Sequence, residues 1–276
     1  MDRIQKALDK AKANQGQVTS PDVRPTTATS KLKHEDPLAP PIENIAYTKT
    51  RVVETSQQQL EEKRVIAGMY TNPQSAVFRM LRTQILQKMR ANDWQTLAIT
   101  SPTAGEGKSL VSANLAVAMA MELNQTVLLV DMDMRNPSIK EYFSLPVNKG
   151  LRDYLEEDLQ LSDVLVNPGV KGMVILPGVG RAENSAELLS SPKMVHLVED
   201  LKAQYDSRMI IFDVPPLLQT DDVLLASKYF DCTLLILEDG KNKEAEITKS
   251  MQLLENHNLI GTVLNKSENP PKHQHY

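Results

Sequence analysis

One ten-residue segment, SPTAGEGKSL from Ser101 to Leu110, has the residue types that hold phosphate groups. Gly105 and Gly107 carry no side chain that would keep phosphate oxygens away from backbone N–H groups. Lys108 is the type that bridges β- and γ-phosphates, and Ser109 offers a hydroxyl to Mg²⁺. The segment therefore predicts a site for a magnesium nucleoside triphosphate.

The match to the phosphate-loop pattern G-x-x-x-x-G-K-[ST] is incomplete, because Pro102 stands in place of the first glycine. A dinucleotide-binding loop, G-x-G-x-x-G, fails at its third glycine, where this chain has Leu110. The loop follows an apolar run and opens an alanine-rich helical segment, so the positive helix end faces the anion. The predicted nucleotide-binding residues are Gly105, Glu106, Gly107, Lys108, Ser109 and Leu110.

Acidic residues end two apolar segments elsewhere in the chain. In VLLVDMDMR, residues 127–135, an extended backbone would point Asp131, Asp133 and Arg135 the same way. In RMIIFDVPPL, residues 208–217, four apolar residues deliver Asp213 to a strand end. Mg²⁺ takes oxygen ligands from a hydroxyl, phosphates and one or two carboxylates, which predicts Ser109, Asp133 and Asp213 as its protein ligands.

Short apolar runs alternate with helical segments from about Arg64 to Lys266. This pattern predicts an α/β fold, a mostly parallel central sheet with helices on both faces, of the phosphate-loop NTPase kind. Ligands in such folds lie at the carboxyl ends of the strands. The expected strands are Gln95–Thr100, Thr126–Asp131, Met173–Leu176, Met209–Asp213, Cys232–Leu237 and Leu259–Leu264.

The chain divides into four parts. Residues 1–13 carry apolar side chains at helical spacing and predict a short amphipathic helix, with a frayed end as the alternative. Residues 14–63 form a linker rich in Pro and Thr and its lead-in, residues 64–266 the phosphate-loop domain, and residues 267–276 a tail.

Composition and the first residues of the chain indicate the class of partner and the compartment. A net charge of −4 and an aromatic content of 4% argue against nucleic acid as a partner. The start of the chain is charged and lacks the apolar region of a secretory signal, which favours the cytoplasm. The single cysteine, Cys232, agrees with a reducing compartment.

The combination of GEGKS, DMDMR and IIFDVPP resembles the bacterial tyrosine kinases (BY-kinases), which are related to the MinD/ParA ATPases. The segments RIQKALDKA, AELLSSPKM, RMIIFDVPPLL and GTVLNKS are similar to tyrosine autokinases of exopolysaccharide and PEP-CTERM gene clusters. The resemblance covers about Arg64 to Lys266. It implies autophosphorylation on tyrosine with ATP and Mg²⁺, in control of exopolysaccharide synthesis and export. It also implies a transmembrane chain-length determinant or co-polymerase as partner, which would recruit the protein to the inner face of the cell membrane.

The resemblance also assigns roles to particular residues. Lys108 would bind ATP, Asp131 would be the base for the tyrosine hydroxyl, and Asp133 would act in catalysis and metal binding, with the division between the two open. Asn265 in VLNK would contact adenine or else cap a strand end. Thr103 stands where the MinD/ParA branch has an extra lysine, which favours the kinase branch.

The chain departs from the family at two places. The family's Glu-x-x-Arg-x-x-Arg helix, which packs into a neighbouring subunit, keeps Arg79 and Arg82 but has Ala76 for the glutamate. The two arginines are thus candidates for a contact between subunits of a homo-oligomer or for a solvated face. The family's tyrosine cluster is reduced to Tyr276, the predicted acceptor, with the six other tyrosines of the chain or another protein as alternatives.

Two further functions stay open at this point. One is an ATPase switch of the MinD/ParA type without tyrosine kinase activity. The other is a non-catalytic, nucleotide-binding partner of a polysaccharide co-polymerase.

Overall fold

The computed structural model describes residues 50–268, except 124 and 204–207. The predicted helix over residues 1–13, most of the linker and Tyr276 lie outside the described residues. Within the described part, no helix is long and apolar enough to cross a membrane.

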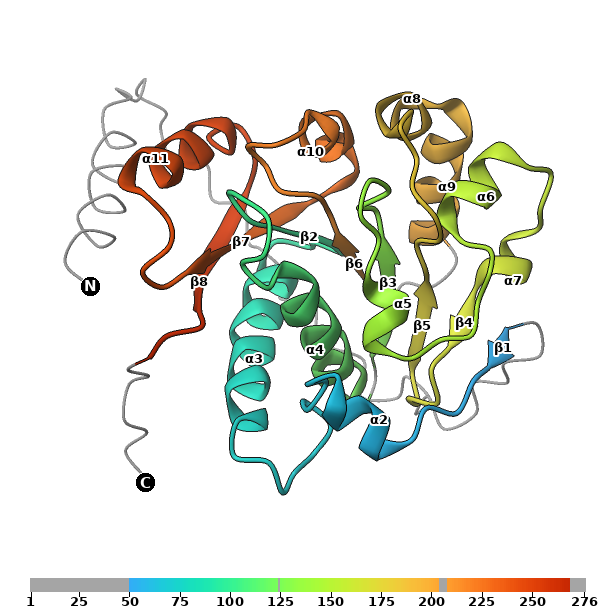
Figure 1. Ribbon diagram of the computed structural model, residues 1–276, viewed down its shortest axis with the longest axis horizontal. Coiled ribbons are helices and arrows are strands. Elements are labelled where there is room, and N and C mark those ends of the chain that lie inside the picture. Colours follow the sequence, from blue (N-terminus) through green and yellow to red (C-terminus); the bar gives the residue numbers. More distant parts are fainter. Residues whose placement is uncertain (1–49, 124, 204–207, 269–276) are drawn as a thin grey trace, which may run out of the picture.

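An eight-stranded sheet forms the centre of the protein (Figure 1). Its strand order is β1-β4-β5-β3-β6-β2-β7-β8, and all neighbours are parallel except β4 and β5. The strands are β1 (Arg51–Val52), β2 (Thr96–Thr100), β3 (Thr126–Asp131), β4 (Val166–Asn167), β5 (Met173–Leu176), β6 (Arg208–Asp213), β7 (Cys232–Glu238) and β8 (Leu259–Asn265). The predicted mostly parallel sheet is confirmed, while β1 and β4, each two residues long, were not predicted.

Helices cover both faces of this sheet, as predicted (Figure 1). Those before β4 are α2 (Gln57–Glu62), α3 (Ser75–Ala91), α4 (Lys108–Ala120), α5 (Ile139–Tyr142), α6 (Leu151–Glu156) and α7 (Leu161–Val164). Those after β5 are α8 (Ser185–Ser190), α9 (Pro192–Ala203), α10 (Asp222–Ala226), the 3₁₀ turn η2 (Ser227–Tyr229) and α11 (Glu244–Leu253).

The strands are apolar on both faces because each face packs against helices. Leu97 and Ile99 of β2 belong to the core beneath α3 and α4. Ala98, between them, belongs to the opposite core, which includes Leu197 of α9. The period of two in a strand divides consecutive residues between the two cores, so the sequence shows continuous apolar runs rather than alternation.

A buried asparagine on α4 fixes the segment that leads into α3. Asn114 Oδ1 accepts hydrogen bonds from the backbone N–H groups of Ile66 at 2.8 Å and Ala67 at 3.0 Å. Its Nδ2 donates to the carbonyl oxygen of Arg64 at 2.9 Å. The chain is therefore anchored to α4 at residues 64–67, where the phosphate-loop domain was predicted to begin, and Arg64 and Ile66 line the same cavity as the phosphate loop.

We expect Asn114→Ala to destabilise the protein strongly. Two buried N–H groups would lose their acceptor, at about 1–3 kcal/mol each, so the free energy of unfolding should fall by about 2–5 kcal/mol. Urea unfolding followed by circular dichroism measures this loss. Asn92→Ala is the matched control, because the Asn92 side chain is exposed and its only hydrogen bond within the described part of the chain is to Lys88 O. Equal losses in the two variants would contradict the anchoring role.

Candidate functional site

The phosphate loop, residues 101–109, connects the end of β2 to the start of α4. Gly105 has a φ of 82° and Gly107 a φ of 91°, values that L side chains rarely adopt. Gly107 is also the N-cap of α4, so the loop backbone passes directly into the helix whose N-terminus attracts anions. The backbone conformation therefore favours glycine at both positions of this loop.

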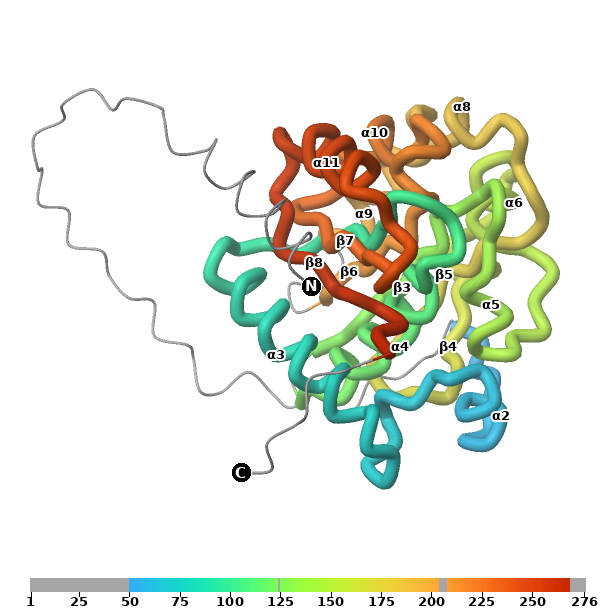
Figure 2. The backbone as a smooth tube through the Cα atoms, turned by 60° about the vertical axis from the view of Figure 1, so that its left-hand side comes forward, coloured from blue at the N-terminus to red at the C-terminus, as the bar shows by residue number. Residues whose placement is uncertain are grey.

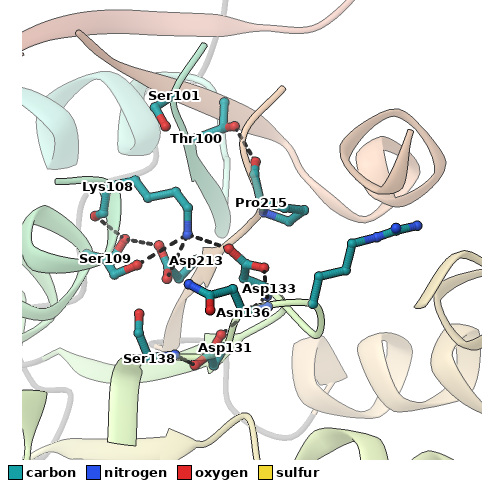
Figure 3. Close-up of polar contacts among 12 residues, drawn as sticks. Thr100, Ser101, Lys108, Ser109, Asp131, Asp133, Asn136, Ser138, Asp213 and Pro215 are labelled. Carbon is teal, nitrogen blue, oxygen red and sulfur yellow. Dashed lines mark hydrogen bonds and ion pairs between the residues drawn. The ribbon is translucent and has the colours of Figure 1, made fainter. Parts of the chain in front are cut away.

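Lys108 lies among side chains from the ends of β3 and β6 and from the start of α4 (Figure 3). Its Nζ is 2.8 Å from Asp133 Oδ2 and 3.6 Å from Asp213 Oδ2, and it donates to Ser109 Oγ at 3.2 Å. Burial alone would lower the pKa of Lys108, but the charges of Asp213 and Asp133 outweigh burial and raise it well above its usual value. The ammonium therefore stays charged and at the centre of the site.

Asp213 is fully buried at the end of β6. Its Oδ1 accepts a hydrogen bond from Ser112 Oγ at 3.0 Å, whereas Oδ2 has no hydrogen-bond partner among the described residues. Burial raises the pKa of this carboxyl, although the charge of Lys108 acts in the opposite direction. A buried carboxylate oxygen with spare acceptor capacity beside Lys108 and Asp133 fits a cation ligand.

Asp131 is not directed as the alternation of an extended strand predicted. The strand ends at Asp131, whose Oδ2 accepts from the N–H groups of Ser138 and Ile139, each at 2.9 Å, at the start of α5 (Figure 3). Arg135 Nε donates instead to Ser185 Oγ at 3.0 Å and Asp222 Oδ2 at 3.2 Å. Asp133 and Arg135 both line the cavity described below, but Asp131 is directed to the start of α5 because the backbone turns after it, so the predicted convergence of all three groups fails at Asp131.

A cavity of about 1050 Å³ opens over the phosphate loop, a size that suits a nucleotide. Its walls come from the loop, the connection from α2 to α3, the start of α5, the Pro215–Pro216 turn and the end of β8. The residues singled out on sequence grounds that line it are Gly105, Gly107, Lys108, Ser109, Leu110, Asp133, Arg135 and Asn265. Glu106, Asp131 and Asp213 lie behind this lining, and Arg79 and Arg82 are not part of it.

Three consecutive carbonyl oxygens of the phosphate loop accept hydrogen bonds from side chains near the ends of β7 and β8, and we call these donors the carbonyl clamp. The pairs are Lys241 Nζ to Ala104 O at 2.6 Å, Lys266 Nζ to Gly105 O at 2.6 Å, and Asn265 Nδ2 to Glu106 O at 2.8 Å. Glu238 Oε2 lies 3.4 Å from Lys241 Nζ and 3.0 Å from Lys266 Nζ. The clamp holds the loop backbone through contacts within the protein.

The carbonyl clamp also adds contacts that the sequence analysis did not predict. The Asn265 amide donates to the loop backbone, and because Asn265 also lines the cavity, its contact with adenine stays a prediction. The carboxylate of buried Glu106 accepts from the backbone N–H of Thr103 at 3.0 Å and from Asn242 Nδ2 at 2.6 Å. Sequence reasoning missed Lys241 and Asn242, although the charged turn EDGKNK after β7 was a signal for them.

Arg79 and Arg82 both make contacts within their own chain. Arg82 lies 2.9 Å from Glu122 and donates to Ala118 O at 3.2 Å, which ties α3 to the end of α4. Arg79 Nη1 donates to Ser75 Oγ at 2.6 Å, and its guanidinium lies 5.3 Å from the ring centre of Tyr70. The solvated-face interpretation does not hold for Arg82, and the contact between subunits stays a prediction.

Asp131 should make the stability of the nucleotide-free protein depend on pH. Burial and then the charge of Asp213 raise its pKa to about 7, against an ordinary value of 3.8. Between these two values the folded carboxyl holds a proton that the unfolded chain has released. The contribution of Asp131 to the free energy of unfolding should therefore be fully present below about pH 4. It should be lost as pH rises through 7.

Urea unfolding at pH 5, 6, 7 and 8 tests this expectation. In Asp131→Asn the free energy of unfolding should fall less steeply with pH than in the wild type. Some dependence on pH should remain, because the pKa of Asp213 is also raised. Identical slopes in the wild type and in Asp131→Asn would show that Asp131 does not titrate in this range.

Comparison with known proteins places this site in a family. Residues 94–238 match the family model described as AAA domain. The chain is 32% identical to the tyrosine-protein kinase YwqD of Bacillus subtilis over 204 residues, which cover 73% of this chain and 84% of YwqD. It is also 32% identical to the tyrosine-protein kinase Etk of Escherichia coli K12 over 76% of this chain, but it spans only 29% of Etk.

Solved structures of related proteins have a similar fold. The chimerical protein CapA2B2 superposes with a TM-score of 0.69 at 30% identity, covering 79% of this chain and 94% of that one. The septum site-determining protein MinD from Pyrococcus horikoshii, complexed with Mg-ADP, superposes with a TM-score of 0.53 at 27% identity, covering 64% and 74%. With its phosphate loop, its two acidic strand ends and these relatives, the chain belongs to the bacterial tyrosine-protein kinases, on a fold shared with MinD-like ATPases.

Proposed function

We propose that this protein transfers the γ-phosphoryl group of ATP to tyrosine hydroxyls of its own chain. The observation that carries the proposal is the position of Lys108, held by Asp133 and Asp213 in the floor of a nucleotide-sized cavity. Phosphoryl transfer needs mainly positioning and charge neutralisation, and these groups provide both.

The donor set fits Mg²⁺. The Ser109 hydroxyl, Asp133 and Asp213 Oδ2, which lacks a hydrogen-bond partner among the described residues, are hard oxygen ligands from three different parts of the fold. Mg²⁺ would take its remaining ligands from phosphates and water. Bound there, Mg²⁺ would neutralise charge on the β- and γ-phosphate oxygens.

We assign different tasks to the two carboxylates after β3. Asp133 lines the cavity and is our candidate for accepting the proton of the tyrosine hydroxyl. Asp131 lies behind it, and its Oδ1 accepts from the N–H of Asp133 at 3.3 Å. Asp131 thus acts as a positioning residue that orders the turn carrying Asp133, and not as the base itself.

The cellular role is part of the same proposal. We infer that the protein regulates exopolysaccharide synthesis and export, and that a transmembrane chain-length determinant or co-polymerase recruits it from the cytoplasm to the membrane. We also propose that it assembles as a homo-oligomer, with Tyr276 as an acceptor. The resemblance of the sequence motifs supports this assignment.

Incubation of the purified chain with γ-³²P-labelled ATP and Mg²⁺ tests the proposal. Phosphotyrosine on the protein, resolved by acid hydrolysis and two-dimensional separation, is the expected result. Release of free phosphate without labelled protein would indicate an ATPase switch of the MinD type instead. Bound, unchanged ATP would indicate a non-catalytic partner, and either of these two results would overturn the kinase assignment.

A further inference from the structure

We propose that Tyr70 is a phosphate acceptor of this protein, phosphorylated by a second copy of the chain. The inference rests on the proposed kinase function and adds a site and a direction of transfer to it. Four tyrosines lie in the described part of the chain, at positions 70, 142, 154 and 229. Their surroundings separate Tyr70 from the other three.

Accessibility is the first difference. The side chain of Tyr70 is 76% exposed, and its hydroxyl has no hydrogen-bond partner among the described residues. Tyr229 is buried and donates to Leu189 O at 2.7 Å. Tyr142 and Tyr154 are half-buried. A hydroxyl that must enter another molecule's cavity has to be free of its own protein, and Tyr70 meets this requirement.

The backbone presents Tyr70 at the tip of a fixed turn. Asn72 N–H donates to Met69 O at 3.1 Å, which closes a four-residue turn with Tyr70 and Thr71 at its centre. Met69 before the turn is buried, and Ala67 is held by Asn114. The connection from α2 to α3, which carries this turn, projects from the body of the protein (Figures 1 and 2). The tyrosine is thus displayed on a rigid base, so presenting it costs little ordering entropy.

The Arg79 guanidinium lies close to the ring on which the phosphate would be placed. The Arg79 guanidinium lies 5.3 Å from the centre of the Tyr70 ring. A phosphate on that ring would carry about −1.5 to −2 charges and would be within reach of this guanidinium after a side-chain rotation. The first turn of α3, which follows directly, contains no acidic residue that would repel the phosphate. Charge therefore favours the modified state of this loop.

The geometry also indicates transfer between copies. Asn72 and Gln74, on the same connection, line the cavity of their own chain, whereas Tyr70 does not. Tyr70 Oη of one copy would attack the γ-phosphorus of ATP in the second copy, forming the Oη–P bond. The bond from the γ-phosphorus to the β,γ-bridging oxygen breaks, ADP leaves with that electron pair, and the phenolic proton passes to the carboxylate of Asp133 in the second copy.

Mixing two full-length chains tests the proposal. Lys108→Met serves as the acceptor, because the variant cannot use its own site, and the wild-type chain serves as the kinase, with a tag on one of them for separation. Trypsin cleavage after Arg64 and Arg79 releases residues 65–79, a peptide whose only tyrosine is Tyr70. We expect phosphate on this peptide of the Lys108→Met chain after mixing with wild type and Mg-ATP, and none when the variant is incubated alone.

Two double variants of the acceptor chain complete the design. Lys108→Met with Tyr70→Phe should lose all phosphate on residues 65–79, and Lys108→Met with Tyr154→Phe should retain it. Phosphate on the acceptor chain confined to other peptides would overturn the role of Tyr70 while leaving the kinase function intact. If, in the mixture, phosphate appears on residues 65–79 of the wild-type chain but not on those of the Lys108→Met chain, transfer between copies is overturned. Absence of phosphotyrosine from both chains would overturn the kinase function as well.

Discussion

Lys108→Met should reduce tyrosine phosphorylation by about 10²-fold or more, the loss typical when one preorganised electrostatic donor is removed from a reacting centre. In the folded protein Lys108 is the cation between Asp133 and Asp213, and methionine has similar length but no charge. Its removal leaves the two buried carboxylates to repel each other and to repel the phosphates. Initial rates of ³²P incorporation at saturating Mg-ATP measure the effect.

Lys193→Met is the matched control for this variant. Lys193 donates to Glu157 O on the surface and lies over the Tyr154 ring, and it does not line the cavity. We expect it to keep the wild-type rate. Circular dichroism of both variants shows whether the fold is retained, and labelling of folded Lys108→Met at the wild-type rate would refute the assigned site.

Gly107→Ala should weaken nucleotide binding by at least about tenfold, a change that corresponds to about 1.4 kcal/mol. Two costs combine at this position. The φ of 91° is strained for any residue with a Cβ, and that Cβ would lie 2.2 Å from Asn265 Nδ2. To relieve the overlap, Asn265 has to leave Glu106 O, so the third contact of the carbonyl clamp is lost and the loop shifts.

Gly240→Ala separates the two costs. Gly240 has a φ of 74°, but a Cβ there would meet nothing within 4 Å. It therefore carries the backbone strain without the collision and lies outside the phosphate loop. Calorimetric titration with Mg-ADP should show near-wild-type affinity for Gly240→Ala and the loss for Gly107→Ala. Equal affinities for the two variants would show that the packing of Asn265 against the loop is not needed for binding.

The sequence predicted the parallel sheet and the position of the phosphate loop because both depend on local patterns. Thr126–Asp131 and Met173–Leu176 were predicted with the bounds that the structure has. Each is a continuous apolar run, and such runs arise when both faces of a strand are buried. The glycines, Lys108 and Ser109 come from one short segment, so their proximity to one another follows from chain connectivity.

What the sequence did not predict depends on turns and on long-range contacts. β1 and β4 are two residues long and carry no periodic signal. The direction of Asp131 depends on the backbone turn after β3, which the assumption of an extended chain does not include. Lys241 and Lys266 reach the phosphate loop across more than 130 positions of sequence, a separation over which no local pattern carries information.

The carbonyl clamp makes the position of the phosphate loop depend on the position of β8. Asn265, the last residue of β8, and Lys266, which follows it, hold the carbonyl oxygens of Glu106 and Gly105. A shift of β8 along its own axis would therefore break two of the three contacts of the carbonyl clamp at once.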